Sequence, residues 1–127
     1  MSRGIEIAIH LTPGPADVDS IACDLGNLAA FRLGQKRGEP LDWQILRVVE
    51  SGGQHFYRLI VRHPSRALDL GIHADLGRIL DEISKNSPDE LREAVHAAES
   101  QGLRKVPIRV IRYEVDYWRD DFWNAIG

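Results

Sequence analysis

The sequence predicts an α+β fold of the ferredoxin-like sandwich type, an antiparallel four-stranded sheet with helices on one face. Two observations lead to this class. Periodic segments follow one another in the order β-α-β-β-α-α-β, which is typical of a split β-α-β fold. A Gly-Gly pair also joins the two middle strands as a tight hairpin. We therefore expect one sheet with the first and third strands at its centre.

The first two elements are a strand and an amphipathic helix. Residues 4–11 alternate between apolar and mostly polar side chains, which is typical of a half-buried strand. A Thr-Pro-Gly-Pro sequence ends this strand, and apolar residues from Val18 to Ala29 then recur along one helical stripe. Gly34 and Gly38 can end the helix, because glycine readily adopts the left-handed conformation of a helix C-terminus.

The middle of the chain predicts a hairpin of residues 41–50 and 54–63. With Gly52 and Gly53 as the two loop residues, Glu50 lies opposite His55 and Arg47 lies opposite Arg58. The register decides which side chains share a face of the sheet. In this register the residues that meet the helices are Leu46, Val48, Tyr57, Leu59 and Val61.

Two helices and a last strand complete the domain. Leu76, Ile79 and Ile83 recur at helical spacing. A capping box at Ser87, followed by proline, begins a separate helix that ends before Gly102. The last strand runs from Val106 to about Tyr117, and Pro107 near its start predicts an edge position, because proline cannot donate a ladder hydrogen bond.

Length and composition predict one domain. Its expected extent is residues 1–117, and residues 118–127 form an aromatic and acidic C-terminal tail. The single Cys23 cannot form an internal disulfide, and the N-terminus has no signal segment, so we expect a cytoplasmic location. No apolar run is long enough to span a bilayer, so we expect no membrane partner. The net charge of −3 argues against binding of nucleic acid by the whole surface.

No motif for catalysis or cofactor binding is present in the sequence. The five histidines lack the spacing of metal ligands. Cys23 lies beside Asp24, and a neighbouring acid disfavours the reactive thiolate. We therefore expect no metal, no cofactor and no catalytic residue, and an enzyme is the less favoured class.

The face of the sheet away from the helices is the first candidate binding surface. In the predicted register it combines Trp43 and Phe56 with Arg47, Arg58 and Arg62. Such a face is too apolar for water and too charged for a core, so a partner should cover it. Opposed arginines are unfavourable without an intervening negative group. That group is Glu6 of the first strand, an acidic partner, a phosphate or the acidic C-terminal segment of the chain itself. Further residues expected on this face are Ala8, His10, Ile45, Val49, Ile60, Arg109, Ile111 and Tyr113.

The C-terminal segment is the second candidate. Five of the nine aromatic residues lie in the last fifteen positions: Tyr113, Tyr117, Trp118, Phe122 and Trp123. Tryptophan and tyrosine are enriched among the residues that dominate binding energy at interfaces. The segment either packs on its own domain or docks on another subunit.

These two candidates predict a non-catalytic protein-protein interaction module, acting as an adaptor, regulatory or inhibitor-like subunit and forming a homodimer. The predicted partner-binding residues are Trp43, Arg47, Phe56, Arg58, Arg62, Tyr117, Trp118, Phe122 and Trp123. One alternative is a small-molecule-binding protein or enzyme with a pocket on the open face near Glu6, His10 and His55. A second is single-stranded nucleic-acid binding by stacking on Trp43 and Phe56. It ranks last, because the strands lack the RNA-recognition signature.

Overall fold

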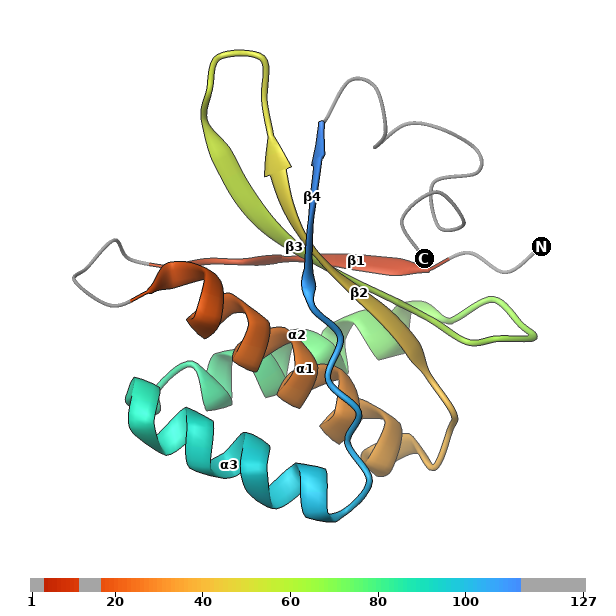
Figure 1. The fold of residues 1–127 in the computed structure, drawn as a ribbon. Helices are drawn as coiled ribbons and strands as arrows, with labels where there is room; N and C mark the ends of the chain where they lie inside the picture. The colour runs from red at the N-terminus through yellow and green to blue at the C-terminus, as the bar shows by residue number, and fades with distance from the viewer. Residues whose placement is uncertain (1–3, 12–16, 113–127) are drawn as a thin grey trace.

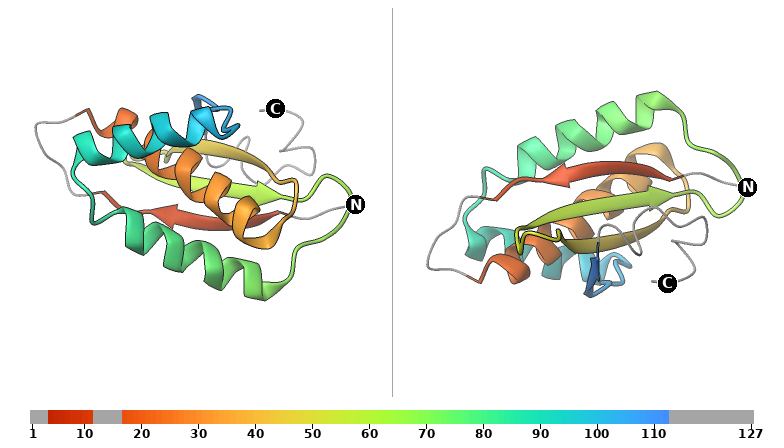
Figure 2. Two further views of the ribbon diagram at one scale, coloured as in Figure 1. Left: turned by 90° about the horizontal axis from the view of Figure 1, so that it is seen from below. Right: turned by 90° about the horizontal axis from the view of Figure 1, so that it is seen from above.

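The computed structural model describes residues 4–11 and 17–112, and its secondary structure follows the predicted order. The elements are β1 (Ile5–Ile9), α1 (Val18–Arg37), β2 (Asp42–Val49), β3 (His55–Arg62), α2 (Leu70–Ile83), α3 (Pro88–Ser100) and β4 (Ile108–Arg112). The four strands form one sheet, and the three helices lie on one of its faces (Figures 1 and 2). The α+β class and the one-sided helical layer are therefore confirmed.

The ferredoxin-like topology is wrong in the order and direction of the strands. The sheet order is β1-β3-β2-β4, so β1 is an edge strand and β2 is central. Strand β3 is antiparallel to β1 and β2, whereas β4 pairs parallel to β2. The sheet is therefore mixed. The edge position predicted for the last strand is confirmed.

The positions of α2 and α3 on either side of α1 explain why β4 lies beside β2. Helix α2 packs on β1 and on α1, and α3 packs on the opposite side of α1 (Figure 2). The chain thus crosses the helical layer before it returns to the sheet. It comes back beside β2, whereas a single helix over β1 would return it to the β1 side.

The hairpin between β2 and β3 has a three-residue loop in place of the predicted two. The Glu50 amide donates to the Gln54 carbonyl at 2.8 Å, and the Gly53 amide donates to the Glu50 carbonyl at 3.0 Å. Gly53 takes a left-handed φ of 81°. A three-residue loop that ends in a left-handed glycine is a common hairpin form. Its effect is to shift the register by one residue.

The shift changes the face on which the side chains of β2 lie. Arg47 lies opposite Tyr57, not opposite Arg58. Ile45 lies on the helix-facing side with Tyr57, within the core built on α1, whereas Leu46 and Val48 lie on the other side. The predicted helix-facing positions of Tyr57, Leu59 and Val61 are confirmed, and those of Leu46 and Val48 are wrong.

A buried asparagine joins α1 to the strands. The Asn27 carboxamide oxygen accepts from the Trp43 indole at 3.0 Å and from the Val106 amide at 2.8 Å. Its nitrogen donates to the carbonyl oxygens of Cys23 at 2.9 Å and Val106 at 3.0 Å. Asn27 is fully buried, and these four bonds satisfy its side chain. They also hold the segment before β4 against α1 and β2.

The capping box of α3 forms as predicted. The Ser87 hydroxyl accepts from the Glu90 amide, and the Glu90 carboxylate accepts from the Ser87 amide, with Pro88 in the first turn. Helix α1 ends at Gly38, which has a left-handed φ of 63°. These boundaries depend on neighbouring residues alone, which explains why local sequence predicts them.

Candidate functional site

The face of the sheet that the helices leave uncovered is the candidate site, here called the open face. Its side chains come from all four strands, because residues paired across the ladder share a face. The open face consists of Glu6, Ala8, Asp42, Gln44, Leu46, Val48, Phe56, Arg58, Ile60, Arg62, Arg109 and Ile111.

The centre of the open face is apolar and buried. Leu46 and Val48 have no exposed surface, and Ile60 and Ile111 are 7% and 4% exposed. The half-buried Phe56 packs against them. All the helices that the structure describes lie on the other face (Figure 2). The helical layer therefore cannot account for the burial of this apolar centre.

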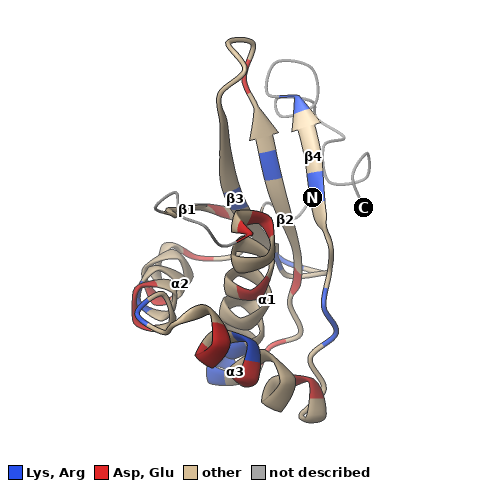
Figure 3. Ribbon diagram, turned by 60° about the vertical axis from the view of Figure 1, so that its left-hand side comes forward, with Lys and Arg blue, Asp and Glu red and all other residues tan. Residues whose placement is uncertain are grey.

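Arginines flank the apolar centre. The Arg58 guanidinium lies over the Phe56 ring, 5.1 Å from its centroid, and its Nε lies 3.4 Å from a Glu6 carboxylate oxygen. Burial raises the pKa of Glu6, and the positive charge of Arg58 opposes this shift. Glu6 is thus the counter-ion expected from the sequence. Arg109 is exposed on β4, and Figure 3 shows the basic positions along this strand.

The structure brings together only part of the predicted partner-binding set. Phe56, Arg58 and Arg62 share the open face, while Trp43 and Arg47 lie on the helix-facing side. The shared face predicted for these five residues is therefore wrong. The expected positions of Glu6, Ala8, Ile60, Arg109 and Ile111 on the open face are confirmed. The predicted residues Tyr113, Tyr117, Trp118, Phe122 and Trp123 lie outside the described residues.

Sequence reasoning missed Leu46 and Val48. A three-residue loop that includes Ser51 would have placed both on the open face. The alternation of β2 could not decide which of its two faces meets the helices, because Ile45 and Val49 are as apolar as Leu46 and Val48.

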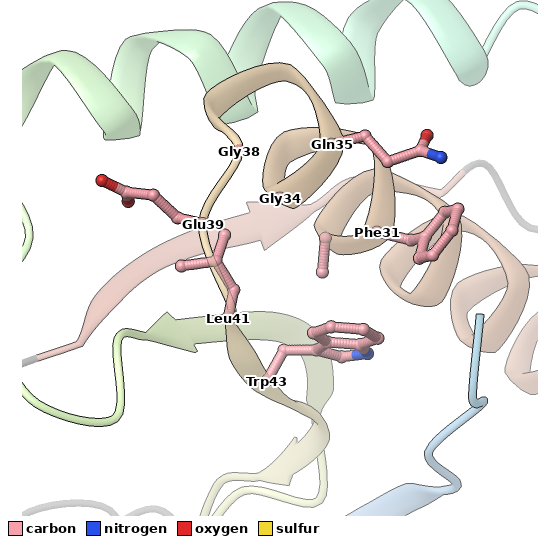
Figure 4. Close-up of a pocket in the computed structure, with 8 residues that line it drawn as sticks. Phe31, Gly34, Gln35, Gly38, Glu39, Leu41 and Trp43 are labelled. Carbon is pink, nitrogen blue, oxygen red and sulfur yellow. The ribbon is translucent and has the colours of Figure 1, made fainter. Parts of the chain in front are cut away.

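Trp43 lines a separate cavity between α1 and β2 (Figure 4). This cavity has a volume of about 300 Å³, and Phe31 and Leu41 form its apolar walls with Trp43. The Gln35 amide at its side donates to the Gln101 carboxamide at 3.3 Å. The Trp43 indole N–H is already bonded to Asn27. The cavity therefore offers apolar packing and few polar groups.

Arg47 belongs to a polar cluster at the start of α1. Its Nη1 lies 3.3 Å from the Asp19 carboxylate, and the Tyr57 hydroxyl donates to the same carboxylate. Beside this cluster is a pocket of about 400 Å³, which is lined by Ile9, His10, Leu11, Val18, His55, Phe56 and Tyr57. The two histidines suggested from the sequence thus share a pocket that Glu6 does not line, and Glu6 pairs with Arg58 instead.

Tyr57 is held in its neutral form. Burial, together with the hydrogen bond and negative charge of Asp19, raises the pKa of Tyr57 to about 12. A neutral phenol that donates to a carboxylate is a poor base at neutral pH. Tyr57 is therefore poorly suited to act as the general base of this pocket.

The raised pKa of Tyr57 predicts a loss of stability in alkali. Its folded pKa exceeds the unfolded value, so its contribution is complete below about pH 10 and is lost as the pH rises towards 12. Urea unfolding at about pH 9 and pH 11 should show a smaller loss of stability for Tyr57→Phe than for the wild type. Equal losses in the two proteins would contradict the Tyr57–Asp19 hydrogen bond.

The remaining candidate chemistry is weak. Burial raises the pKa of Cys23, and its thiol donates to the Val106 carbonyl at 3.5 Å. Within residues 4–11 and 17–112, no group of three or more His, Cys, Asp or Glu side chains could hold a metal ion.

Comparisons with known proteins add no functional assignment. The chain matches no protein-family model and no curated protein. In the described part of the chain, each helix is too short or too polar to cross a bilayer. Function is therefore inferred from the open face.

Proposed function

We propose that the chain is a non-catalytic protein-interaction module whose open face binds a polypeptide segment rich in acidic and aromatic residues. The observation that carries this proposal is the buried apolar centre, flanked by arginines, on the face opposite the helices. From the predicted set the proposal keeps Phe56, Arg58 and Arg62. It replaces Trp43 and Arg47 by Leu46, Val48, Ile60, Arg109 and Ile111.

The chemistry of the open face favours a polypeptide partner. Aliphatic side chains at its centre can pack against apolar or aromatic groups, and the arginines at its border can pair with carboxylates. A buried apolar centre with a polar rim is the usual anatomy of a protein interface. An adaptor, regulatory or inhibitor-like subunit in the cytoplasm suits such a face, and a second copy of the chain is one partner that it admits.

Single-stranded nucleic acid fits the open face less well. Its predicted stacking platform needed Trp43 beside Phe56, and these side chains lie on opposite faces. The face also carries the carboxylates of Glu6 and Asp42, which repel phosphates.

Affinity capture with the full chain tests the proposal. The face variant carries Arg58→Gln and Arg109→Glu. A matched control carries Arg92→Gln and Arg104→Glu, which make the same charge change at exposed positions on α3 and after it. A protein captured from the source cells by the wild type should be recovered at least about tenfold less with the face variant. It should be recovered normally with the control.

The two variants must first show wild-type circular dichroism, so that lost capture reports binding and not unfolding. Equal capture by the face variant and the wild type would refute the proposed function.

A further inference from the structure

We propose that residues 113–127 of the same chain occupy the open face, so that the module is closed by its own C-terminal segment. This inference rests on the proposed function, because it assigns an internal competitor to the same binding face. A partner then binds only when it displaces this segment.

The exposure of two neighbouring residues on β4 is the first argument. Val110 and Ile111 are adjacent on an edge strand, so their side chains point to opposite faces. Val110 is 55% exposed, whereas Ile111 is only 4% exposed. At this end of the strand the helix-facing side is therefore bare at Val110, whereas the open side is covered at Ile111. The described helices lie on the wrong face to provide that cover.

The origin of the segment is the second argument. Strand β4 ends at Arg112, one residue after Ile111, which belongs to the apolar centre. The segment that starts at residue 113 is therefore attached to the sheet at the border of the open face. Fifteen residues can span up to about 50 Å when extended. Four strands spaced about 4.8 Å apart measure only about 15 Å across, so the segment can cross the whole face.

Complementary chemistry is the third argument. The segment has four acidic residues and one arginine, and it contains five aromatic side chains: Tyr113, Tyr117, Trp118, Phe122 and Trp123. The open face offers apolar ground at its centre, with Arg58, Arg62 and Arg109 around it. Aromatic rings can cover the aliphatic centre while carboxylates meet the arginines.

A tethered segment is an effective competitor. Its local concentration is of the order of millimolar for a short linker, whatever the protein concentration. A partner's apparent affinity equals its intrinsic affinity multiplied by the fraction of molecules in which the open face is free. The partner class follows from this competition, since it must offer the same combination of carboxylates and aromatic rings.

Paramagnetic NMR on the full chain tests whether residues 113–127 occupy the open face. A nitroxide is attached at Asn124→Cys in a Cys23→Ser background, and isoleucine, leucine and valine methyl signals are recorded. The label should broaden the signals of Leu46, Val48, Ile60 and Ile111. Ile83 on α2 should keep its intensity, because α2 lies on the other face.

A control label at Asn86→Cys should give the reverse pattern. Asn86 is exposed in the turn between α2 and α3, so its label should broaden Ile83 and spare Ile111. Full intensity of the open-face methyls with the label at position 124 would overturn the inference. The proposed function would survive that result if capture still failed with the face variant.

A mixed sample separates the same chain from a second copy. In it, isotope-labelled chains without nitroxide are combined with unlabelled chains that carry it. Broadening that occurs only when the nitroxide and the isotope label are on the same chain supports the proposal. Equal broadening in the mixed sample would show that a second copy occupies the open face, and would overturn the proposal. If Cys23→Ser does not fold, Asp120→Lys with Asp121→Lys should instead shift the Ile60 and Ile111 methyl signals, and unchanged signals would contradict the inference.

Discussion

Replacing Asn27 by leucine is expected to lower the free energy of unfolding by about 3 kcal/mol or more. The leucine fills a similar volume but removes every hydrogen bond of the carboxamide. The Trp43 indole and the Val106 amide and carbonyl then lose these buried partners. Equilibrium urea unfolding, followed by circular dichroism, measures the change.

The control for Asn27 is an exposed asparagine. Asn86 lies in the turn between α2 and α3, so Asn86→Ala should change stability by no more than about 0.5 kcal/mol. If Asn27→Leu were as stable as the wild type, Asn27 could not hold the segment before β4 against α1.

Replacing Gly26 by valine is expected to cost about 2–3 kcal/mol, because α1 and β2 approach closely at this residue. A Cβ atom at Gly26 would lie 2.7 Å from both Cγ1 and Cδ1 of Ile45, which is fully buried. The added side chain must push the helix from the sheet or force Ile45 into a poor rotamer. Chemical unfolding should show the loss.

Alanine substitutions at Gly26 and Gly77 distinguish the effect of crowding on stability from the effect of helix propensity. A Cβ at Gly77 in α2 would lie 3.5 Å from the Ile7 Cδ1 atom, which is an ordinary contact. Gly77→Ala should therefore raise stability by up to about 1 kcal/mol, the intrinsic advantage of alanine in a helix. Gly26→Ala should lower stability despite the same advantage. A gain in both variants would contradict the close packing of α1 on β2.

Local sequence predicted the helices better than the sheet. The capping box at Ser87 and the left-handed Gly38 act within a few residues, so their patterns suffice. The partner of β4 depends instead on how α2 and α3 pack around α1, and no nearby residue encodes it. Pro107 could exclude a central position for β4 but could not choose between β1 and β2 as its neighbour.

The candidate site was predicted only in part. The residues that share it depend on the register of the β2–β3 hairpin. Gly52 and Gly53 suit either a two-residue loop or the last two positions of a three-residue loop. Both faces of β2 are apolar, so burial does not distinguish the two. The residues of β3 were placed correctly, as Phe56 and Arg58 show. Those of β2 were inverted, which exchanged Trp43 and Arg47 for Leu46 and Val48.

The accessibility of Val110 and Ile111 to a soluble nitroxide tests most directly whether the open face is occupied. In the wild-type chain at low concentration, the probe should broaden the Val110 methyl signals strongly and leave those of Ile111 and Ile60 nearly unchanged. Equal broadening of all three residues would mean that the open face is bare, and would contradict the account of a face held for an acidic, aromatic segment.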